Sequence, residues 1–352
     1  MTTARTLCWL TAAALLGGCG GSRSRPPTAA KPSAPRSPVT LAPAPGARPP
    51  ARGHPGRARR SRPQALVTAE TENRLLIVDL ETGAVNGRVT VPAGPQYVAA
   101  QPGLALVASP SAGAVALLEG DPLRVVRVFS RFGAPHITEL SPDGEHAYVT
   151  DDARGTLTVI QLSNERVIGT VQIGTGAHHM ASSPDQRRLW VALGESARTI
   201  AIVDTSDPSR PRVVGRLHLG FAAHDLAFSP DGQRVWISSA GRGDVSVFRA
   251  SDRRLLLHVP VGPAPQHIGF AGAYAYLTSG YGRTIEQVAA GTGTVIRRAS
   301  APYGSFELAA ADGFVTTSSL LDGRLAIYTP QLRLLRLLRL SAATRDVSIS
   351  DP

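Results

Sequence analysis

The 352-residue sequence predicts an all-β fold, a seven-bladed β-propeller with four-stranded blades, over residues 65–352. A short motif that follows a Gly-rich turn recurs seven times at a mean spacing of about 41 residues, which is the period of a propeller blade. Within each repeat, runs of β-branched and aromatic residues alternate with turn residues at intervals of about 8–12 residues, as an all-β fold requires. The motif is centred on Tyr97, His136, His179, His224, His267, Phe306 and Asp346.

Each repeat contains four predicted strands, which we name A to D from the ring axis outward. Strand A ends in a turn at residues 141–144 and again at residues 229–232, where the sequence Ser-Pro-Asp-Gly suits a type I turn. In the repeat that contains the first of these turns, we expect strand B at residues 147–150, strand C at residues 156–160 and strand D at residues 166–171.

The strand count predicts how the ring closes. Residues 65–68, 75–78 and 87–91 provide strands B, C and D of the first blade, and residues 345–349 are a lone strand A. We expect this last strand to complete the first blade and to remove the open sheet edges. Residues 331–340 have an arginine at every third position, as an amphipathic helix can, but their place in the repeat predicts strand D of the last blade.

The formal charge of +11 belongs to the start of the chain. Residues 1–64 contain 11 of the 37 basic residues and no acidic residue, whereas residues 65–352 contain 26 residues of each sign. The predicted propeller is therefore neutral. With 5% aromatic residues in the chain, it lacks the basic, aromatic surface of a single-strand nucleic-acid binder, and we expect no nucleic-acid partner.

The N-terminus reads as an export signal. Arg5 precedes an apolar stretch at residues 7–16, which is too short to span a membrane as a helix. The following Leu-Gly-Gly-Cys, ending at Cys19, resembles a bacterial lipobox. The resemblance implies a signal peptide of residues 1–18, cleavage before Cys19 and lipidation of its sulfur; an ordinary secretory signal with an incidental cysteine is the alternative. Cys8 and Cys19 both precede the propeller, which therefore has no disulfide and no zinc–thiolate site.

Residues 19–64 form a linker that is rich in Pro, Ala, Gly, Ser and Arg and has too little apolar content to fold. Its prolines favour an extended, semi-stiff spacer. Two roles remain open: a plain stalk, and a basic strap that binds anionic lipid headgroups or wall polymers.

Residues 146–185, which begin His-Ala-Tyr-Val-Thr, resemble the YVTN-type β-propeller repeat. The resemblance covers residues 65–352 and is weakest in the last two repeats. Some lactonase-like enzymes share this kind of propeller and use polar residues around the axial cavity, although their site residues have no positional match in this sequence. The resemblance also includes DNA-binding propellers.

Four consecutive repeats place a histidine at the start of strand A: His136, His179, His224 and His267. The D-to-A and B-to-C connections share one face of the ring, the top face, so these residues lie at its channel mouth. The imidazoles can hydrogen-bond to a neighbouring blade, or they can face the cavity and bind an anion, act as a base or hold a transition metal. For a metal, the candidate ligands are His179, His224 and Asp225, with Glu307 and Asp346 as further oxygen ligands.

A second pattern lies in the B-to-C turns of the same face. Six of the seven turns contain an arginine, and acidic residues accompany most of them. These are either local ion pairs of small value or a guanidinium ring that recognises carboxylates or phosphates. The candidate ligand-binding arginines are Arg154, Arg198, Arg242 and Arg283.

The function that the sequence favours is a non-catalytic binding or scaffolding module, lipid-anchored outside the cytoplasm, at the cell surface or in the periplasm. No nucleophile elbow, zinc-protease helix or P-loop motif is present. A lactonase-like hydrolase or isomerase that uses cavity histidines, with or without a metal, is the alternative. We expect no cofactor, while a transition metal stays open. The expected partners are the membrane and a protein, peptide or small anionic ligand at the top face of a monomer.

Overall fold

The computed structural model describes residues 62–194, 197–311 and 313–350. The signal peptide of residues 1–18, the lipidation site Cys19 and nearly all of the linker of residues 19–64 lie outside the described residues and stay predictions. Within the described ranges, no helix has the length and apolar character that crossing a membrane requires.

The described residues form antiparallel β-strands and two short 3-10 helices, η1 (Glu70–Glu72) and η2 (Pro110–Ala112), which agrees with the predicted all-β class. The strands belong to one compact unit and make five four-stranded sheets and one seven-stranded sheet.

The strands are given in order of pairing. The first sheet is β27 (Thr344–Ser350), β1 (Gln64–Ala69), β2 (Arg74–Asp79) and β3 (Val85–Thr90), and the second is β4 (Tyr97–Gln101), β5 (Leu104–Ser109), β6 (Ala114–Glu119) and β7 (Arg124–Phe129). The third sheet is β8 (Pro135–Leu140), β9 (His146–Asp151), β10 (Thr156–Gln161) and β11 (Arg166–Gln172). The seven-stranded sheet is β12 (Ala177–Ser182), β13 (Arg188–Leu193), β14 (Ala197–Asp204), β15 (Arg212–Phe228), β16 (Arg234–Ser239), β17 (Asp244–Arg249) and β18 (Leu255–Pro260). The last two sheets are β19 (Ile268–Ala271), β20 (Tyr274–Ser279), β21 (Thr284–Ala289) and β22 (Thr294–Ser300); and β23 (Ser305–Ala311), β24 (Phe314–Ser319), β25 (Arg324–Tyr328) and β26 (Leu334–Arg339).

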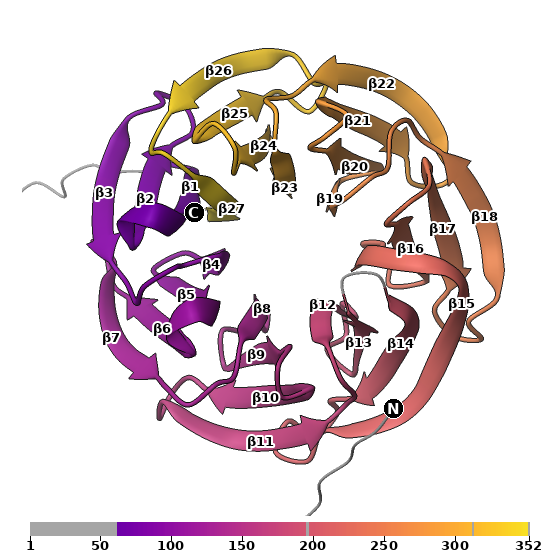
Figure 1. Ribbon diagram of the computed structural model, residues 1–352, viewed down its shortest axis with the longest axis horizontal. Coiled ribbons are helices and arrows are strands. Elements are labelled where there is room, and N and C mark those ends of the chain that lie inside the picture. Colours follow the sequence, from indigo (N-terminus) through magenta and orange to yellow (C-terminus); the bar gives the residue numbers. More distant parts are fainter. Residues whose placement is uncertain (1–61, 195–196, 312, 351–352) are drawn as a thin grey trace, which may run out of the picture. The chain divides into compact units, whose positions relative to one another are not determined.

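The sheets surround a common centre, with β4, β8, β12, β19, β23 and β27 nearest to it (Figure 1). Strand β15 is 17 residues long and pairs with β14 through its first half and with β16 through its second. It therefore contains both the predicted D strand of one repeat and the A strand of the next. Strand β27 pairs with β1, with Val347 opposite Val67 and Ile349 opposite Ala65.

The segment with an arginine at every third position forms a strand, as its place in the repeat predicted. Strand β26 pairs with β25, and Leu338 lies opposite Leu325. The neighbouring strand supplies the hydrogen-bond partners, so sheet pairing overrides the helix-like spacing of this short segment.

The core lies between neighbouring sheets. In one cluster, Tyr148 and Leu157 of the β8–β11 sheet pack on Met180 and Val191 of the next sheet. Each fully buried aliphatic side chain stabilises the fold by about 1.5–3 kcal/mol. This packing holds the inner strands, and the side chains that they direct to the centre, in fixed positions.

Three Ser-Pro-Asp turns follow inner strands: two at residues 141–144 and 229–232, as predicted, and a third at residues 183–186. The hydroxyls of Ser183 and Ser229 each donate to the aspartate two residues later, at 2.6 Å in both turns. The fourth position has a positive φ of 69° at Gly144 and Gly232, and Gln186 takes φ 58° at the same place. Gln186 therefore occupies a left-handed position that glycine adopts without cost.

Candidate functional site

Irregular pairing at the start of the inner strands brings two consecutive side chains to the centre. The register of β8, β12, β15 and β23 against the next strand shifts at this point, for example between Ala177 and Met180. Here the inner strand has one more residue than its partner, which is a β-bulge. A bulge re-aims side chains that a regular strand would direct to opposite faces, and residue pairs such as His178–His179 can therefore both face the axis.

The strand register defines which residues are equivalent. The fourth residue of each second strand pairs with Val98, Thr138, Met180, Leu226, Ile268, Leu308 or Val347 of the inner strand. The residue just before each of these forms what we name the lower ring: Tyr97, Ile137, His179, Asp225, His267, Glu307 and Asp346. The residue before that forms the upper ring: Gln96, His136, His178, His224, Gln266, Phe306 and Arg345.

These rings correct the sequence alignment. The four motif histidines were expected at one structural position, but His179 and His267 belong to the lower ring, whereas His136 and His224 belong to the upper ring. The bulges do not cause the difference, because β8 and β12 have the same register shift. The lead-in to the strand differs instead: β8 begins two residues after Gly133, whereas β12 begins one residue after Gly176, so an alignment on the glycine is one residue out of register.

Two cavities lie on either side of this layer. The first has a volume of about 410 Å³ and is lined by upper-ring residues, including His136, His178 and His224, and by Tyr281 and Pro263 of the connecting loops. It thus opens among the B-to-C and D-to-A connections, the predicted top face. The second has a volume of about 550 Å³ and is lined by His267, other lower-ring residues and the inner strands. His179 and Glu307 line both cavities and therefore separate them.

His179 lies at the centre of a cluster of five imidazoles. The residue is buried, with 2% exposure, and neither ring nitrogen has a hydrogen-bond partner among the residues that the structure describes. Its ring centroid lies 4.6 Å from that of His178, 4.8 Å from His267, 4.9 Å from His224 and 5.2 Å from His136. A buried polar group without a partner costs free energy, so these two nitrogens need a functional explanation.

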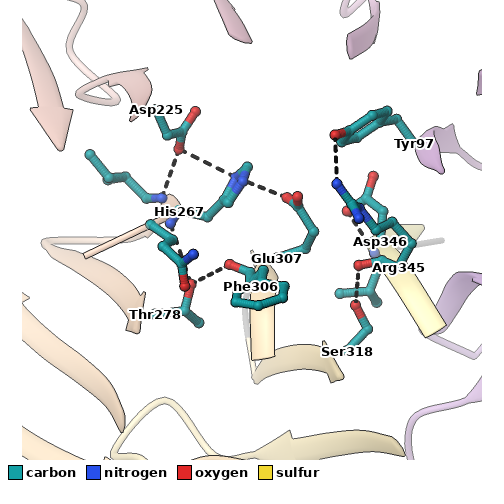
Figure 2. A network of polar contacts seen from close by, with 12 residues as sticks. Tyr97, Asp225, His267, Thr278, Phe306, Glu307, Ser318, Arg345 and Asp346 are labelled. Carbon is teal, nitrogen blue, oxygen red and sulfur yellow. Dashed lines mark hydrogen bonds and ion pairs between the residues drawn. The ribbon is translucent and has the colours of Figure 1, made fainter. Parts of the chain in front are cut away.

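Two of the other imidazoles are oriented by carboxylates. The Nδ1 of His267 lies 2.9 Å from Glu307 and 3.5 Å from Asp225 (Figure 2). The Nδ1 of His178 lies 3.1 Å from Asp152. Metal-binding histidines usually donate their second ring N–H to a carboxylate in this way, because it fixes the ring and its tautomer.

Burial and charge divide the cluster into neutral and charged groups. Burial lowers the pKa of His136 and of His179 well below the ordinary value, and neighbouring imidazoles lower both further. Burial also opposes the charged form of His267, but Glu307 and Asp225 raise its pKa to about 9. Burial raises the pKa of Asp225 to about 6. The neutral His136 and His179 keep lone pairs that a metal ion can accept.

Two histidine triads meet the distance requirement for a shared ion. The inner triad is His179, His224 and His267, and the outer triad is His136, His178 and His179; the candidate ligand atoms of each lie within 4.8 Å of one another. Ring nitrogens about 2.1 Å from a tetrahedral ion place the ring centroids about 5 Å apart. The inner triad has centroid separations of 4.8, 4.9 and 5.6 Å, so its rings already have this spacing.

The aspartates predicted as oxygen ligands of a metal do not belong to either triad and have structural contacts instead. Asp225 does not belong to either triad but accepts the N–H of Ile268 at 2.9 Å and orients His267. Asp346 makes the equivalent contact with the N–H of Val98 at 2.8 Å. These carboxylates thus link neighbouring inner strands as well as facing the cluster.

The four arginine candidates do not line either central cavity within the described residues. Arg154 is 54% exposed in its side chain and pairs with Asp151 at 3.8 Å. Arg242 pairs with Asp244, and Arg283 lies over the Tyr303 ring at 4.9 Å from its centroid. Arg198 is exposed.

Two polar residues at the centre were not predicted as site residues from the sequence. Arg345 lines the first cavity and donates to the Tyr97 hydroxyl at 3.4 Å (Figure 2). Glu139 lines the second cavity and accepts hydrogen bonds from the Ser182 hydroxyl and, at 3.1 Å, from its N–H. Burial raises the pKa of Glu139 to about 7. The available signal was its position, because Glu139 is the only acidic residue three places after any motif residue.

Comparisons with known proteins concern the fold. Residues 100–196 match the family model described as Cytochrome D1 heme domain, which is less than a third of the chain. No curated protein matches the sequence.

Solved structures are similar over most of the chain. Hydrazine synthase of Kuenenia stuttgartiensis has 15% identity and a TM-score of 0.66, with 76% of this chain and 92% of that chain covered. A functionally unknown protein of Desulfotomaculum acetoxidans has 15% identity and a TM-score of 0.72, with 83% and 100% covered. The dihydro-heme d1 dehydrogenase NirN has 16% identity and a TM-score of 0.59, with 79% and 64% covered. With its four-stranded antiparallel sheets around one centre, this chain has a fold of the β-propeller type.

Proposed function

We propose that this protein is a binding protein of the cell envelope that captures a transition-metal ion in the centre of a propeller. The observation that carries the proposal is His179, a buried imidazole with two unpartnered nitrogens among four other imidazoles. The ion would be held by the inner triad, whose three rings have the spacing of a tetrahedral site. Imidazole nitrogens favour zinc, copper, nickel and iron over magnesium and calcium.

The ring that holds this site has seven blades in our proposal. Strand β15 would be the outer strand of one blade and the inner strand of the next, which divides the seven-stranded sheet into two blades. Together with the five four-stranded sheets this makes seven. Pairing of β27 with β1 supports closure of the ring, because the last strand of the chain then completes the first blade.

In this proposal the protein is located on the outer side of a membrane. The lipobox-like sequence ending at Cys19 would provide the acyl anchor, and the basic linker would hold the propeller beside anionic headgroups. A metal-binding propeller placed there would meet ions that arrive from outside the cytoplasm.

The cluster fits a bare ion better than an iron macrocycle. The imidazoles pack against one another with centroid separations of 3.6 to 5.6 Å, so a planar ring system does not fit between them. The likeness to the heme-domain family covers only residues 100–196, and this segment contains three of the five clustered histidines.

An enzymatic role is the second candidate. Three histidines with an open fourth position are typical of catalytic zinc, which activates a bound water. The observation in its favour is the 410 Å³ cavity above His179 and His224, which gives a small substrate room beside the ion. Lactone hydrolysis that depends on the metal and on His224 would support this role.

The test is metal binding by the purified full-length protein. Zn²⁺, Cu²⁺, Ni²⁺ and Co²⁺ are titrated separately, with the Co²⁺ visible spectrum as a report of nitrogen ligands. We expect one tight equivalent and a loss of affinity of about a hundredfold or more in His179→Ala. The matched control is His258→Ala, because His258 is exposed on β18. Absence of bound metal in the unaltered protein, or equal affinity in both variants, would overturn the proposal.

A further inference from the structure

We infer that the outer triad is a loading position from which the ion passes to the inner triad while His179 holds it. This inference rests on the proposed function, since it concerns the same metal. It adds a route, a direction and a separate role for His136 and His178, which the binding proposal alone does not require.

The position of the two triads relative to the cavities gives the direction. His136 and His178 line only the first cavity, on the top face, whereas His267 lines only the second. His179 lines both and belongs to both triads. An ion in the first cavity can therefore contact the whole outer triad. Of the inner triad it meets His179 and His224 there, and it reaches His267 only by moving toward the second cavity.

The ring geometry of the outer triad favours weaker binding. The rings of His136 and His178 are stacked, with centroids 3.6 Å apart and planes inclined by 23°. Tyr97 packs on His136 at a centroid distance of 4.1 Å, which limits the freedom of that ring to turn away. Stacked rings lie closer than the spacing of about 5 Å that a tetrahedral ion requires.

The charges favour the inner position. His267 of the inner triad contacts Glu307 and Asp225, and Asp346 lies at the equivalent place of the lower ring. In the outer triad, His178 contacts Asp152, whose side chain is 38% exposed. A divalent cation thus gains more carboxylate charge as it moves down, and interactions are stronger away from bulk water.

The transfer is a ligand exchange without electron transfer. The bonds from the ion to His136 and His178 break, and bonds to His224 and His267 form, while the bond to His179 is kept. If His267 has a proton on the nitrogen that binds the ion, this proton passes to water. His179 can serve both positions because neither of its nitrogens is held by a hydrogen bond.

The experiment separates the rate of loading from the affinity at equilibrium. Stopped-flow mixing of the full-length protein with Co²⁺ is followed at the ligand-field bands, and affinity is measured by competition with a chelator. In His136→Ala/His178→Ala we expect loading to slow by about tenfold or more, with the affinity changed by less than about threefold. In His224→Ala and His267→Ala we expect the tight affinity to fall by about a hundredfold, with rapid weak binding retained.

A milder variant guards against misfolding. Asp152→Asn keeps the size of the side chain and removes the carboxylate that orients His178, so it should slow loading and leave the tight affinity unchanged. The matched control for the histidine variants is His218→Ala, because His218 is exposed on β15.

The outcomes distinguish the two proposals. Unchanged loading in both outer-triad variants, with tight binding intact, would overturn the relay and leave metal binding standing. Equal losses of affinity for outer- and inner-triad variants would also overturn it, because they would indicate one site with all five imidazoles. Failure of the unaltered protein to bind Co²⁺ and each of the other three metal ions would instead overturn the proposed function.

Discussion

His267 and Glu307 face each other across two neighbouring inner strands, with 2.9 Å between the imidazole Nδ1 and a carboxylate oxygen. Both residues are buried, at 8% and 5% exposure. The contact holds the His267 ring so that its other nitrogen is available to the inner triad. A carboxylate from one sheet thus orients a proposed metal ligand from the preceding one.

The first prediction concerns this carboxylate. Glu307→Gln should lower the metal affinity by about 10–100-fold, because a neutral amide orients the ring less strongly and supplies no negative charge. Chelator competition with Zn²⁺ measures the effect. The control is Glu72→Gln, since Glu72 is exposed in η1. Equal affinity of the two variants would show that Glu307 does not support the site.

A second prediction concerns the turn at residues 183–186. Gln186→Gly should raise the unfolding free energy by about 1 kcal/mol, because the left-handed backbone is strained for an L side chain. The reciprocal change Gly232→Ala should destabilise, since the same φ occurs there and an added Cβ would lie 3.1 Å from the Pro184 ring. Urea unfolding of both variants measures the effect. A more stable Gly232→Ala would contradict this explanation.

Removal of the last strand is the third prediction. Deletion of residues 343–352 removes β27 and uncovers β1, including the buried Val67 opposite Val347. We expect a loss of about 3 kcal/mol or more, and a new sheet edge that promotes association. Thermal melting and light scattering are the measurements, with Leu337→Ser on the exposed face of β26 as control. Melting behaviour that is unchanged by the deletion would contradict closure through β27.

The fourth prediction is a pH dependence that arises from Glu139. Its pKa is about 7 in the folded protein and 4.5 in ordinary surroundings, because burial disfavours the charge. The folded state therefore binds more protons between these values, so the Glu139 contribution to stability falls as pH rises from about 4.5 to 7. Glu139→Gln should remove this decline and be relatively more stable at pH 8 than at pH 4.

Urea unfolding at a series of pH values tests this, and Glu145→Gln, at an exposed turn position, is the control. The measured quantity is the difference in unfolding free energy between variant and unaltered protein at each pH. A difference that stays constant from pH 4 to pH 8 would contradict a raised pKa of Glu139 in the folded state.

Local sequence features were sufficient for the strands and their order. The spacing of the repeats, the β-branched runs and turns such as Ser229–Asp231 are each local, and β-strand alternation and turn chemistry follow from neighbouring residues. The same features placed β26 correctly despite its arginine spacing, because each repeat supplies an independent copy of the pattern.

The arrangement of the side chains at the centre could be predicted only in part from the sequence. The sequence alone identified the motif histidines and the neighbouring acids Asp225, Glu307 and Asp346 as chemistry at the inner strands, and it determined the all-β class. Only the tertiary structure decided that His179 stands between two triads and that Glu307 holds His267. It also placed Arg154 and Arg242 away from the central cavities. The reason is physical: the number of residues between the motif glycine and the inner strand varies by one between blades, which changes the ring that a side chain joins without a clear sequence signal. In addition, contacts between inner strands join residues about 40 positions apart, and only the packing of the sheets determines their distances.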